Sequence, residues 1–545
     1  MAETITAASL AIVCQVYLSP IPEPSTLKIV STYFSGNLVL LLILLRGGLG
    51  IVQTTTKLTH LNIVFLLTAT IFTLIRRLYF SPLSHIPGPS RFALTKLFLA
   101  NEYFQGRAAL TTRALHQEYQ ADVVRIGPNQ VSVVNVDAIS KLYSGKYPRG
   151  TFYEIAALNG EINLNSTRDY AKHTPWRRIW EMAFANSSFK EYNRRIEHHV
   201  NKMMTVLHKA SSKEVDFSKA AENMVFDMYA NLVINFDPTR VLTLTQHDRF
   251  RLLYPHWTTR WKGRWHLYVA GSLRNLTQLL DLLPETEDIR IFRKKGKAML
   301  TQRQNFTSPQ KDIFHHLLAE DSESGTKFTQ KELNSNAQLV IIAGTDTTVS
   351  VVIQTVKKLA NSPEIYRRLQ NEVDELYNRG QSITIETVRN LEYLNGVINE
   401  ALRLYPPTPS GTYATTYPQG LDVDGVHIPG NVQVDTPFLA LMRDERYFIR
   451  GDEFIPERWT SERPELLKDK RAFIPFGYGV HACVGKTLAL HELRLVLSLI
   501  AHNFNLHIGP SHDEDFYNSQ WRDHAVLQVG RLWMSFEPRS PSRDG

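Results

Sequence analysis

An uncharged apolar run from Leu58 to Ile75 constrains the fold more than any other feature of the chain. It has about 18 residues, and a helix of that length, rising about 1.5 Å per residue, is long enough to cross the apolar core of a bilayer. Arg76 and Arg77 follow directly, as is typical of the cytoplasmic end of a transmembrane helix. We therefore expect a membrane anchor that leaves the rest of the chain on the cytoplasmic side.

Other apolar runs leave the number of transmembrane helices open. The run from Ile29 to Leu45 is apolar enough to insert, and the run from Thr4 to Pro22 is a weaker third candidate. The anchor region, residues 1–80, is therefore expected to hold one to three transmembrane helices. A cleaved signal peptide is the competing interpretation, but Glu3 precedes the apolar run and no Lys or Arg does.

A proline-rich hinge is predicted at residues 81–90. Pro82, Pro87 and Pro89 are incompatible with a continuous helix and stiffen the chain. Beyond the hinge, no Gly/Ser-rich linker divides residues 91–545, so we expect a single catalytic domain there.

The periodicity of this domain predicts a mainly α fold with a small β-sheet subregion near its N-terminal side. Apolar residues recur at helical spacing from about residue 187 to residue 405, with breaks at Pro and Gly. Residues 121–136 alternate apolar and polar positions around a Gly-Pro turn, which is typical of a β-hairpin.

Composition excludes several classes of function. The formal charge of +8 comes from scattered basic residues, and no nucleic-acid-binding motif is present, so a membrane surface or an acidic partner fits better than nucleic acid. Cys14 and Cys483 are too few for a disulfide framework. The catalytic part is therefore expected to face a reducing compartment.

Cys483 lies in a glycine-rich loop that precedes an apolar helix. The loop reads Phe476-Gly477-x-Gly479-x-His481-x-Cys483-x-Gly485. A thiolate at a helix N-terminus is favoured by the unpaired N–H groups and the helix dipole, and glycines allow a flat ligand to approach the backbone. The competing interpretation is a buried structural cysteine, which is the commoner fate of a lone cysteine.

A second unusual stretch, Ala-Gly-Thr-Asp-Thr-Thr at residues 343–348, lies within a helix that is apolar on nearly every face. Burying Asp346 and three hydroxyl groups is costly unless they form hydrogen bonds or ion pairs. Polar residues at positions that are expected to be apolar are typical of a functional site. Gly344 is expected to let a flat cofactor or dioxygen approach the backbone, and the threonines to loosen the helical ladder. Alternatively, Asp346 is a satisfied buried acid that caps another segment.

Two pairs of residues at helical spacing suggest further sites. Glu400 and Arg403 are three apart, just before Pro406-Pro407, and their apolar neighbours suggest a buried pair instead of a surface one. His173 and Arg177 are four apart and share a helix face. For this second pair, an amphipathic helix with solvated arginines is the alternative.

Residues 254–268 interleave tryptophans and a tyrosine with arginines and a lysine. Such a stretch suits a lipid headgroup layer, although a surface loop with half-buried tryptophans explains it equally well. Stacking on nucleic acid is a third and weaker interpretation.

Taken together, the motifs resemble the cytochrome P450 family of haem-thiolate monooxygenases in order and spacing, over about residues 80–535. The resemblance implies that fold, with Cys483 as the ligand of haem iron. It also implies that Phe476, Gly477, His481 and Gly485 belong to the haem-binding loop, and that His173 and Arg177 contact the haem propionates. Asp346 would pass protons, and Thr347 would hydrogen-bond the oxygen. Glu400, Arg403 and Arg458 would form a buried network that locks the loop. Two departures are His481, where the family most often has Arg, and Ala414, where many relatives have a propionate-binding Arg.

The resemblance implies a membrane-bound monooxygenase that inserts one atom of O2 into an apolar small molecule, and we expect a role in fungal secondary metabolism. The cofactor would be haem b. No Gly-x-Gly-x-x-Gly follows a strand, so electrons from NADPH would arrive through a partner NADPH-cytochrome reductase, docked on a basic face that includes Lys486 and Arg178. The expected location is the endoplasmic reticulum membrane, with the catalytic domain in the cytoplasm.

Two alternatives remain at this stage: a haem-thiolate isomerase or dehydratase that acts without a reductase, and a non-catalytic haem-binding membrane protein. The substrate cannot be identified from the sequence, because specificity in this fold is determined by side chains on several loops, for instance around residues 150–165 and 405–415.

Overall fold

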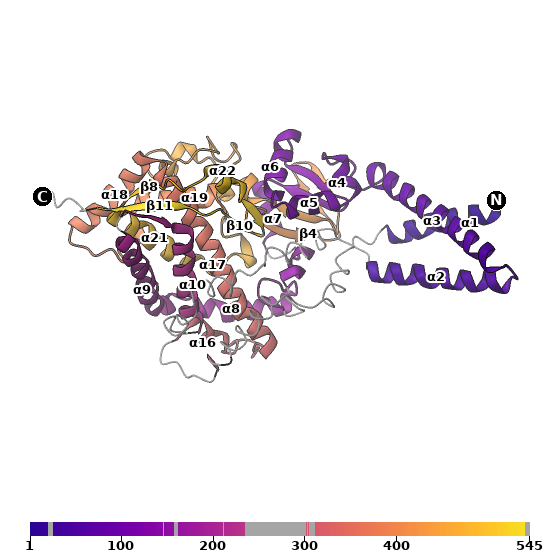
Figure 1. Cartoon of the computed structure of the whole chain (residues 1–545), viewed down its shortest axis with the longest axis horizontal. Coiled ribbons are helices and arrows are strands. Elements are labelled where there is room, and N and C mark those ends of the chain that lie inside the picture. Colours follow the sequence, from indigo (N-terminus) through magenta and orange to yellow (C-terminus); the bar gives the residue numbers. More distant parts are fainter. Residues whose placement is uncertain are drawn as a thin grey trace.

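The computed structural model describes residues 1–19, 25–144, 147–156, 162–210, 212–234, 301, 303–304 and 311–539. The basic and aromatic stretch 254–268 lies outside these ranges. The N-terminal helices extend from one end of a helical body, which also carries several small sheets (Figure 1).

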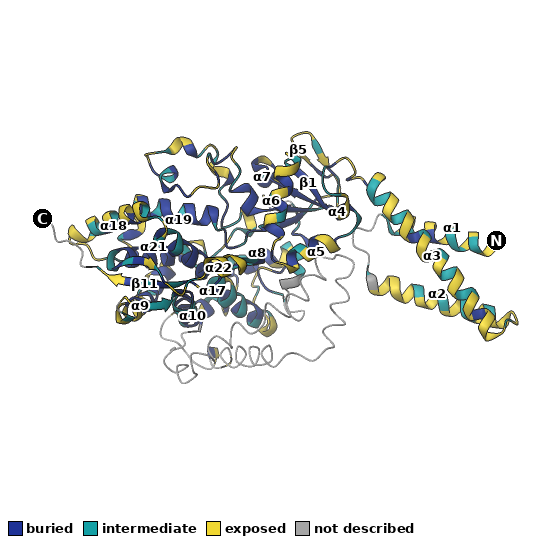
Figure 2. Cartoon of the chain, turned by 45° about the horizontal axis from the view of Figure 1, so that its top comes forward, coloured by how far each residue is buried: buried dark blue, intermediate teal, exposed yellow. Residues whose placement is uncertain are grey.

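Three helices form the N-terminal region: α1 (Ala2–Leu18), α2 (Thr26–Arg46) and α3 (Ile51–Tyr79). Most of their side chains are exposed or half-buried, in contrast to the buried centre of the body (Figure 2). Leu27–Arg46 and Ile51–Tyr79 are long and apolar enough to cross a membrane, and α1 is a shorter apolar helix. Apolar surface of this extent on paired helices is typical of segments that lie in lipid.

Polar side chains connect the three N-terminal helices. The Asn62 amide donates a hydrogen bond of 2.6 Å to Asn37 Oδ1, which links α3 to α2. The Thr73 hydroxyl donates one of 2.9 Å to Gln15 Oε1, which links α3 to α1. In apolar surroundings such bonds hold helices together, so α3 is connected to both α1 and α2.

Residues 80–89 form turns between α3 and α4 (Ser90–Leu94). The Arg125 N–H donates a hydrogen bond of 2.7 Å to the carbonyl of Pro87, and its guanidinium donates one of 3.1 Å to Ser81 Oγ. The proline-rich segment is therefore held against strand β1 of the body.

The body is mainly helical, as predicted, and α17 runs through its centre (Figure 1). Its helices among the described residues are α4, α5 (Leu97–Phe104), α6 (Ala108–Tyr119), α7 (Val136–Leu142), α8 (Tyr170–Ala183), α9 (Asn186–Ala210), α10 (Phe217–Ile234), α16 (Ile313–Leu317), α17 (Gln330–Ala360), α18 (Pro363–Asn378), α19 (Glu392–Leu404), α20 (Phe438–Leu441), α21 (Lys486–Asn503) and α22 (Glu514–Ser519). A capping box of Thr329 and Glu332 starts α17, because each side chain bonds the other's backbone N–H.

α17 packs against α10, α18, α19 and α21, and these helices build the main core. α17 is long and apolar enough to cross a membrane, but 61% of its most apolar 18-residue stretch is buried inside the body. Its composition therefore reflects burial in protein.

A four-stranded sheet with the order β1-β2-β7-β4 lies on the side of the body nearer the N-terminal helices (Figure 1). Its strands are β1 (Val123–Gly127), β2 (Gln130–Val133), β4 (Thr412–Thr415) and β7 (Gln433–Thr436). The predicted hairpin is confirmed, because β1 and β2 pair antiparallel, with Val124 opposite Ser132. β2 pairs parallel with β7, and β7 antiparallel with β4.

Three smaller sheets complete the described part. β11 (Trp533–Pro538) lies between β3 (Glu214–Asp216) and β8 (Phe504–Ile508). The strands β5 (Leu421–Val423) and β6 (Val426–Ile428) form one hairpin, and β9 (Arg522–His524) and β10 (Val526–Gln528) form another. The turn between β9 and β10 reaches the cavity described next.

Candidate active site

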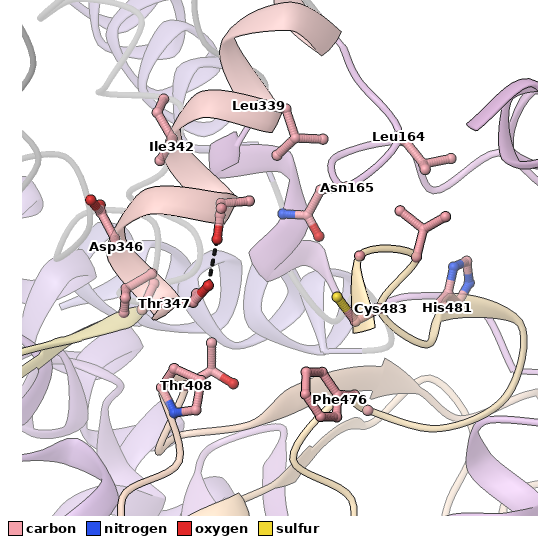
Figure 3. A pocket seen from close by; sticks show the side chains of 18 of the residues that line it. Leu164, Asn165, Leu339, Ile342, Asp346, Thr347, Thr408, Phe476, His481 and Cys483 are labelled. Atoms are coloured by element: carbon pink, nitrogen blue, oxygen red, sulfur yellow. Dashed lines mark hydrogen bonds between the residues drawn. The ribbon is translucent and has the colours of Figure 1, made fainter. Parts of the chain in front are cut away.

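A cavity of about 480 Å³ lies between α17 and the loop that precedes α21 (Figure 3). The middle of α17, the turn after α19, the start of α20 and the β9–β10 turn contribute mostly apolar walls, among them Leu339, Ile342 and Phe438. On the other side the cavity reaches Cys483 and the N-terminal part of α8. The space is suited to a flat apolar group with a second apolar molecule above it.

The loop before α21 aims the Cys483 sulfur into this cavity (Figure 3). Gly477 and Gly479 adopt φ angles of 72° and 69°, the left-handed region that favours glycine. A Cβ on Gly479 would lie 1.7 Å from the carbonyl oxygen of Tyr143, so only glycine fits there. The Cys483 N–H donates a hydrogen bond of 2.7 Å to the carbonyl of Phe476, which closes the loop.

The surroundings of Cys483 suit a thiolate only if a cation binds it. Cys483 lines the cavity, and its side chain is exposed to that space. Burial raises the pKa of the thiol, while the N–H of Gly485 and the positive charges of Arg177 and Lys486 lower it. A metal cation at the sulfur would supply the remaining stabilisation of the thiolate.

The donor set also restricts which metal group fits. Within the described ranges, no group of three or more His, Cys, Asp or Glu side chains could hold a metal ion. A metal group that brings most of its own ligands would fit at Cys483, and haem is such a group, because its porphyrin provides four nitrogens.

Basic side chains form one wall of the cavity beside the Cys483 loop. His173 and Arg177, which were predicted to share a helix face, both lie on α8 and line the cavity. Arg177 donates a hydrogen bond of 2.5 Å to the carbonyl of Ala482, and His481 Nδ1 lies 3.0 Å from His173 Nε2. His481 Nε2 is buried without a hydrogen-bond partner in the described structure. Such a wall suits the carboxylates of a haem.

The surroundings favour the neutral forms of His173 and His481. Burial is the larger cause and the positive charge of Arg149 the next, and together they lower the pKa of His173 to about 4 and that of His481 further. An anion in the cavity would favour the protonated forms instead.

Thr347 lies on the cavity side of α17, and its hydroxyl donates a hydrogen bond of 2.5 Å to the carbonyl of Ala343 (Figure 3). Asp346 also borders the cavity, but its carboxylate lies on the side of α17 away from the Cys483 sulfur (Figure 3). Its charge acts on Glu222 of α10: burial first, then Asp216 and Asp346, raise the pKa of Glu222 to about 8. Asp346 therefore borders the cavity and lies near enough to Glu222 for its charge to act on that carboxyl group.

Gly344 is required by packing as well as lying at the cavity. A Cβ at this position would lie 2.2 Å from the Tyr229 ring of α10, so the missing side chain makes room for a tyrosine. Gly344 also lines the cavity, and its role in admitting a flat cofactor or dioxygen stays a prediction.

The structure brings Glu400, Arg403 and Arg458 together, with side chains that are fully buried. Arg403 donates hydrogen bonds of 2.8 and 2.7 Å to the two oxygens of Glu400, and Arg458 donates one of 3.0 Å. The guanidinium groups also bond backbone carbonyls, including those of Met442 and Leu466. The network thus ties α19 to the chain that leads to the Cys483 loop.

Sequence reasoning missed several residues of the site. Trp459 donates a hydrogen bond of 2.8 Å to Glu400 and completes its partners; its place beside Arg458 was the signal that could have identified it. Asn165 points into the cavity (Figure 3). Glu492 of α21 is buried, which raises its pKa to about 8. No local pattern marks Asn165 or Glu492.

Arg178, which was predicted on a docking face for an electron donor, forms ion pairs within the chain. It donates hydrogen bonds of 2.8 and 2.7 Å to the two oxygens of Asp321, and it also pairs with Glu323 at 3.1 Å. These carboxylates balance its charge within the chain. Lys486, by contrast, is exposed at the start of α21.

Comparisons with known proteins agree with this geometry. The family model for cytochrome P450 matches residues 87–531. Cytochrome P450 67 of Uromyces fabae is 31% identical over 540 residues, covering 95% of this chain and 96% of that protein. Cytochrome P450 monooxygenase FCK2 of Fusarium pseudograminearum is 30% identical over 502 residues, covering 90% and 89%. The crystal structure of the cytochrome P450DA heme domain shares the fold, with a TM-score of 0.68 at 18% identity over 84% of this chain and 98% of that one.

The chain therefore belongs to the cytochrome P450 family. It is an oxidoreductase of the monooxygenase class, and its cofactor is thiolate-ligated haem.

Proposed function

We propose that this protein is a membrane-anchored monooxygenase that inserts one atom of O2 into an apolar small molecule, with electrons from a partner NADPH-cytochrome reductase. The observation that carries the proposal is that Cys483 and the Asp346-Thr347 pair border one largely apolar cavity from opposite sides. We assign residues 1–80 to the anchor, residues 81–90 to the hinge and residues 91–545 to the catalytic domain.

Cys483 is the residue we assign as the iron ligand, since the other cysteine, Cys14, lies in the N-terminal helix α1. Phe476, Gly477 and Gly485 would surround the sulfur, and His173, Arg177 and His481 would hold the propionates. When bound, the haem supplies activation of O2, and its thiolate ligand favours O–O cleavage. The apolar walls exclude bulk water from the reacting atoms.

Proton delivery is the task we assign to α17. The Thr347 hydroxyl faces the cavity and would hydrogen-bond the oxygen being reduced. Asp346 lies one residue earlier, borders the same cavity and would pass the protons. Glu400, Arg403 and Arg458 keep the Cys483 loop in place without touching the substrate.

The N-terminal helices support attachment to the endoplasmic reticulum membrane, with Arg76 and Arg77 at the cytoplasmic end of α3. We place the reductase at the face around Lys486, near the start of α21 and the Cys483 loop. The fungal sources of the similar monooxygenases support a role in fungal secondary metabolism.

The reduced, CO-bound full-length protein tests the ligand: we expect the absorption band that is diagnostic of thiolate ligation, and its loss in Cys483→Ala. Co-expression with a fungal reductase then tests the activity, with NADPH consumption stimulated by terpenoid, polyketide or indole substrates. Turnover of a hydroperoxide without NADPH would show an isomerase or dehydratase instead. Normal haem uptake without substrate-stimulated NADPH use would show a non-catalytic haem-binding protein.

A further inference from the structure

Two contacts hold α1 alongside α3 in the same direction. Towards the start of both helices, the Lys57 ammonium group of α3 pairs with Glu3 of α1 at 2.7 Å. Towards their other ends, the Thr73 hydroxyl donates a hydrogen bond of 2.9 Å to Gln15 Oε1. α1 therefore follows α3 over almost its whole length, and the surroundings of one helix are also those of the other.

α2 lies beside α3 in the opposite direction. The Asn62 amide of α3 donates a hydrogen bond of 2.6 Å to Asn37 Oδ1 of α2, and the Tyr33 hydroxyl of α2 donates one to Asn62 Oδ1. Only residues 47–50 connect the end of α2 to the start of α3. These two ends therefore lie on the same side of the helix group.

The amide side chains in the apolar stretches of these helices face inward, whereas the large apolar side chains face outward. Gln15, Asn37 and Asn62 are half-buried at contacts between helices. The side chains that are more than half exposed include Ile5, Val13 and Val16 on α1, Leu38, Leu42 and Ile43 on α2, and Ile63, Leu67 and Ile71 on α3. Helices that pack in water have the reverse arrangement, and polar groups that face the interior of a helix group are typical of lipid surroundings.

Small hydroxyl groups on the outer faces are compatible with lipid. Thr6 of α1 and Ser31 of α2 are exposed, but each donates a hydrogen bond of 3.0 Å to a carbonyl of its own helix. Such bonds satisfy the hydroxyl groups where water is absent. The outer face of α1 therefore has the same character as the outer faces of α2 and α3.

We propose that α1, α2 and α3 all cross the membrane as one bundle, and that the N-terminus lies on the side opposite the catalytic domain. The inference rests on the membrane anchoring in the proposed function. Arg76 and Arg77 assign the end of α3 to the cytoplasmic side, so the start of α3 lies on the other side. Because α1 follows α3 in the same direction, its first residue lies there too.

The length of α1 and the charges of the bundle agree with this orientation. α1 has 17 residues, which is at the short end of the range that crosses a bilayer. The pair of Glu3 and Lys57 bounds both apolar stretches at one interface, where charged side chains reach water. The basic residues at the cytoplasmic end are Lys28, Arg76 and Arg77, and those at the opposite end are Arg46 and Lys57. The cytoplasmic end thus has the excess that transmembrane helices favour.

The test inserts one N-glycosylation acceptor tag per variant into the full-length protein: at the N-terminus, after Ser19, after Gly48 or at the C-terminus. Each variant is expressed in yeast, and glycosylation in microsomes is measured as a shift in electrophoretic mobility that endoglycosidase H removes. An acceptor is modified only on the luminal side of the membrane. We expect modification at the N-terminus and after Gly48, and none after Ser19 or at the C-terminus, which is the control.

Other patterns would overturn the inference. A single crossing by α3 would leave the N-terminal, Ser19 and Gly48 tags all modified, and crossings by α2 and α3 alone would leave only the Gly48 tag modified. Failure of the proposed function would be distinct, because the tags report orientation without haem. The absorption band of the reduced, CO-bound protein in the same membranes reports the Cys483 ligand separately.

If a tag prevented insertion, cross-linking would decide. The Thr4 hydroxyl lies 3.5 Å from His60 Nε2, so a short bifunctional maleimide should link Thr4→Cys to His60→Cys in a Cys14→Ser background. The link is detected after cleavage at a protease site inserted after Gly48, because it keeps the two fragments joined. Thr4→Cys with Tyr79→Cys is the control and should not link, since Tyr79 ends α3 at the other side. Absence of the Thr4–His60 link, or equal linking of both pairs, would overturn the inference.

Discussion

The Thr347 hydroxyl donates a hydrogen bond of 2.5 Å to the Ala343 carbonyl, one turn earlier in α17, and its oxygen remains at the cavity wall. Thr347→Ala removes this group without changing the Cys483 loop. We expect product formation per NADPH to fall at least roughly 10-fold, and peroxide release to rise, because positioned proton donors contribute roughly 10²-fold to 10⁴-fold. Measuring product, peroxide and NADPH together tests this, with Thr347→Ser as the control. A Thr347→Ala variant with wild-type coupling would remove Thr347 from the mechanism.

Gly344 is predicted to be required for the packing of α10 on α17. In Gly344→Ala the added methyl group would lie 2.2 Å from the Tyr229 ring, and overpacking of this kind costs about 1–3 kcal/mol. We expect a lower unfolding midpoint, and a partial recovery in the double variant Gly344→Ala/Tyr229→Leu, since leucine occupies less space. A double variant no more stable than the sum of its single changes would count against this role.

The Glu400 network is predicted to matter far more than an ion pair at the surface. Arg458→Ala leaves a fully buried carboxylate with fewer partners, which costs about 3–5 kcal/mol. We expect low haem content together with a reduced unfolding midpoint. Arg379→Ala breaks a pair that is 69% and 64% exposed, so it should cost less than about 1 kcal/mol. Similar losses in both variants would contradict the special role of the network.

Glu492 should make stability depend on pH. Burial raises the pKa of its carboxyl group from the ordinary 4.5 to about 8. Between these two values the native state keeps a proton that the unfolded state releases, so the free energy of unfolding falls as pH rises. For one such proton, the free energy of unfolding falls by at most about 1.4 kcal/mol per pH unit.

The test is the unfolding midpoint of the wild type and Glu492→Gln from pH 5 to pH 9. Glutamine cannot ionise, so the variant should lose less stability over this range. Some dependence remains in both proteins, because burial also raises the pKa of Asp435 to about 7 and that of Asp523 to about 6. Identical pH profiles would mean that Glu492 is not protonated in the native protein.

Local motifs were sufficient to predict much of the fold and of the site. The hairpin at residues 121–136, the helix that ends before Pro406-Pro407 and the glycine turns around Cys483 all follow from backbone preferences of neighbouring residues. His173 and Arg177 came from helical spacing alone, since residues four apart share a face.

Local motifs did not show which distant side chains meet. Gly344 accommodates Tyr229 of α10, and Arg178 is neutralised by Asp321. Both contacts join segments whose sequences contain no signal for each other. A single sequence records which residues are suited to burial or to a charge, but not which distant side chain they meet.

The sequence by itself determined the resemblance from which the class of chemistry follows, because the motifs around Asp346, Glu400, Arg458 and Cys483 stand in the family's order and spacing. Only the tertiary structure decided how the remaining charges are arranged. It pairs Arg149 with Ala414 of β4 through an isolated bridge and places a guanidinium on the cavity wall. The physical reason is that strand pairing and core packing bring side chains together in space without regard to their separation along the chain.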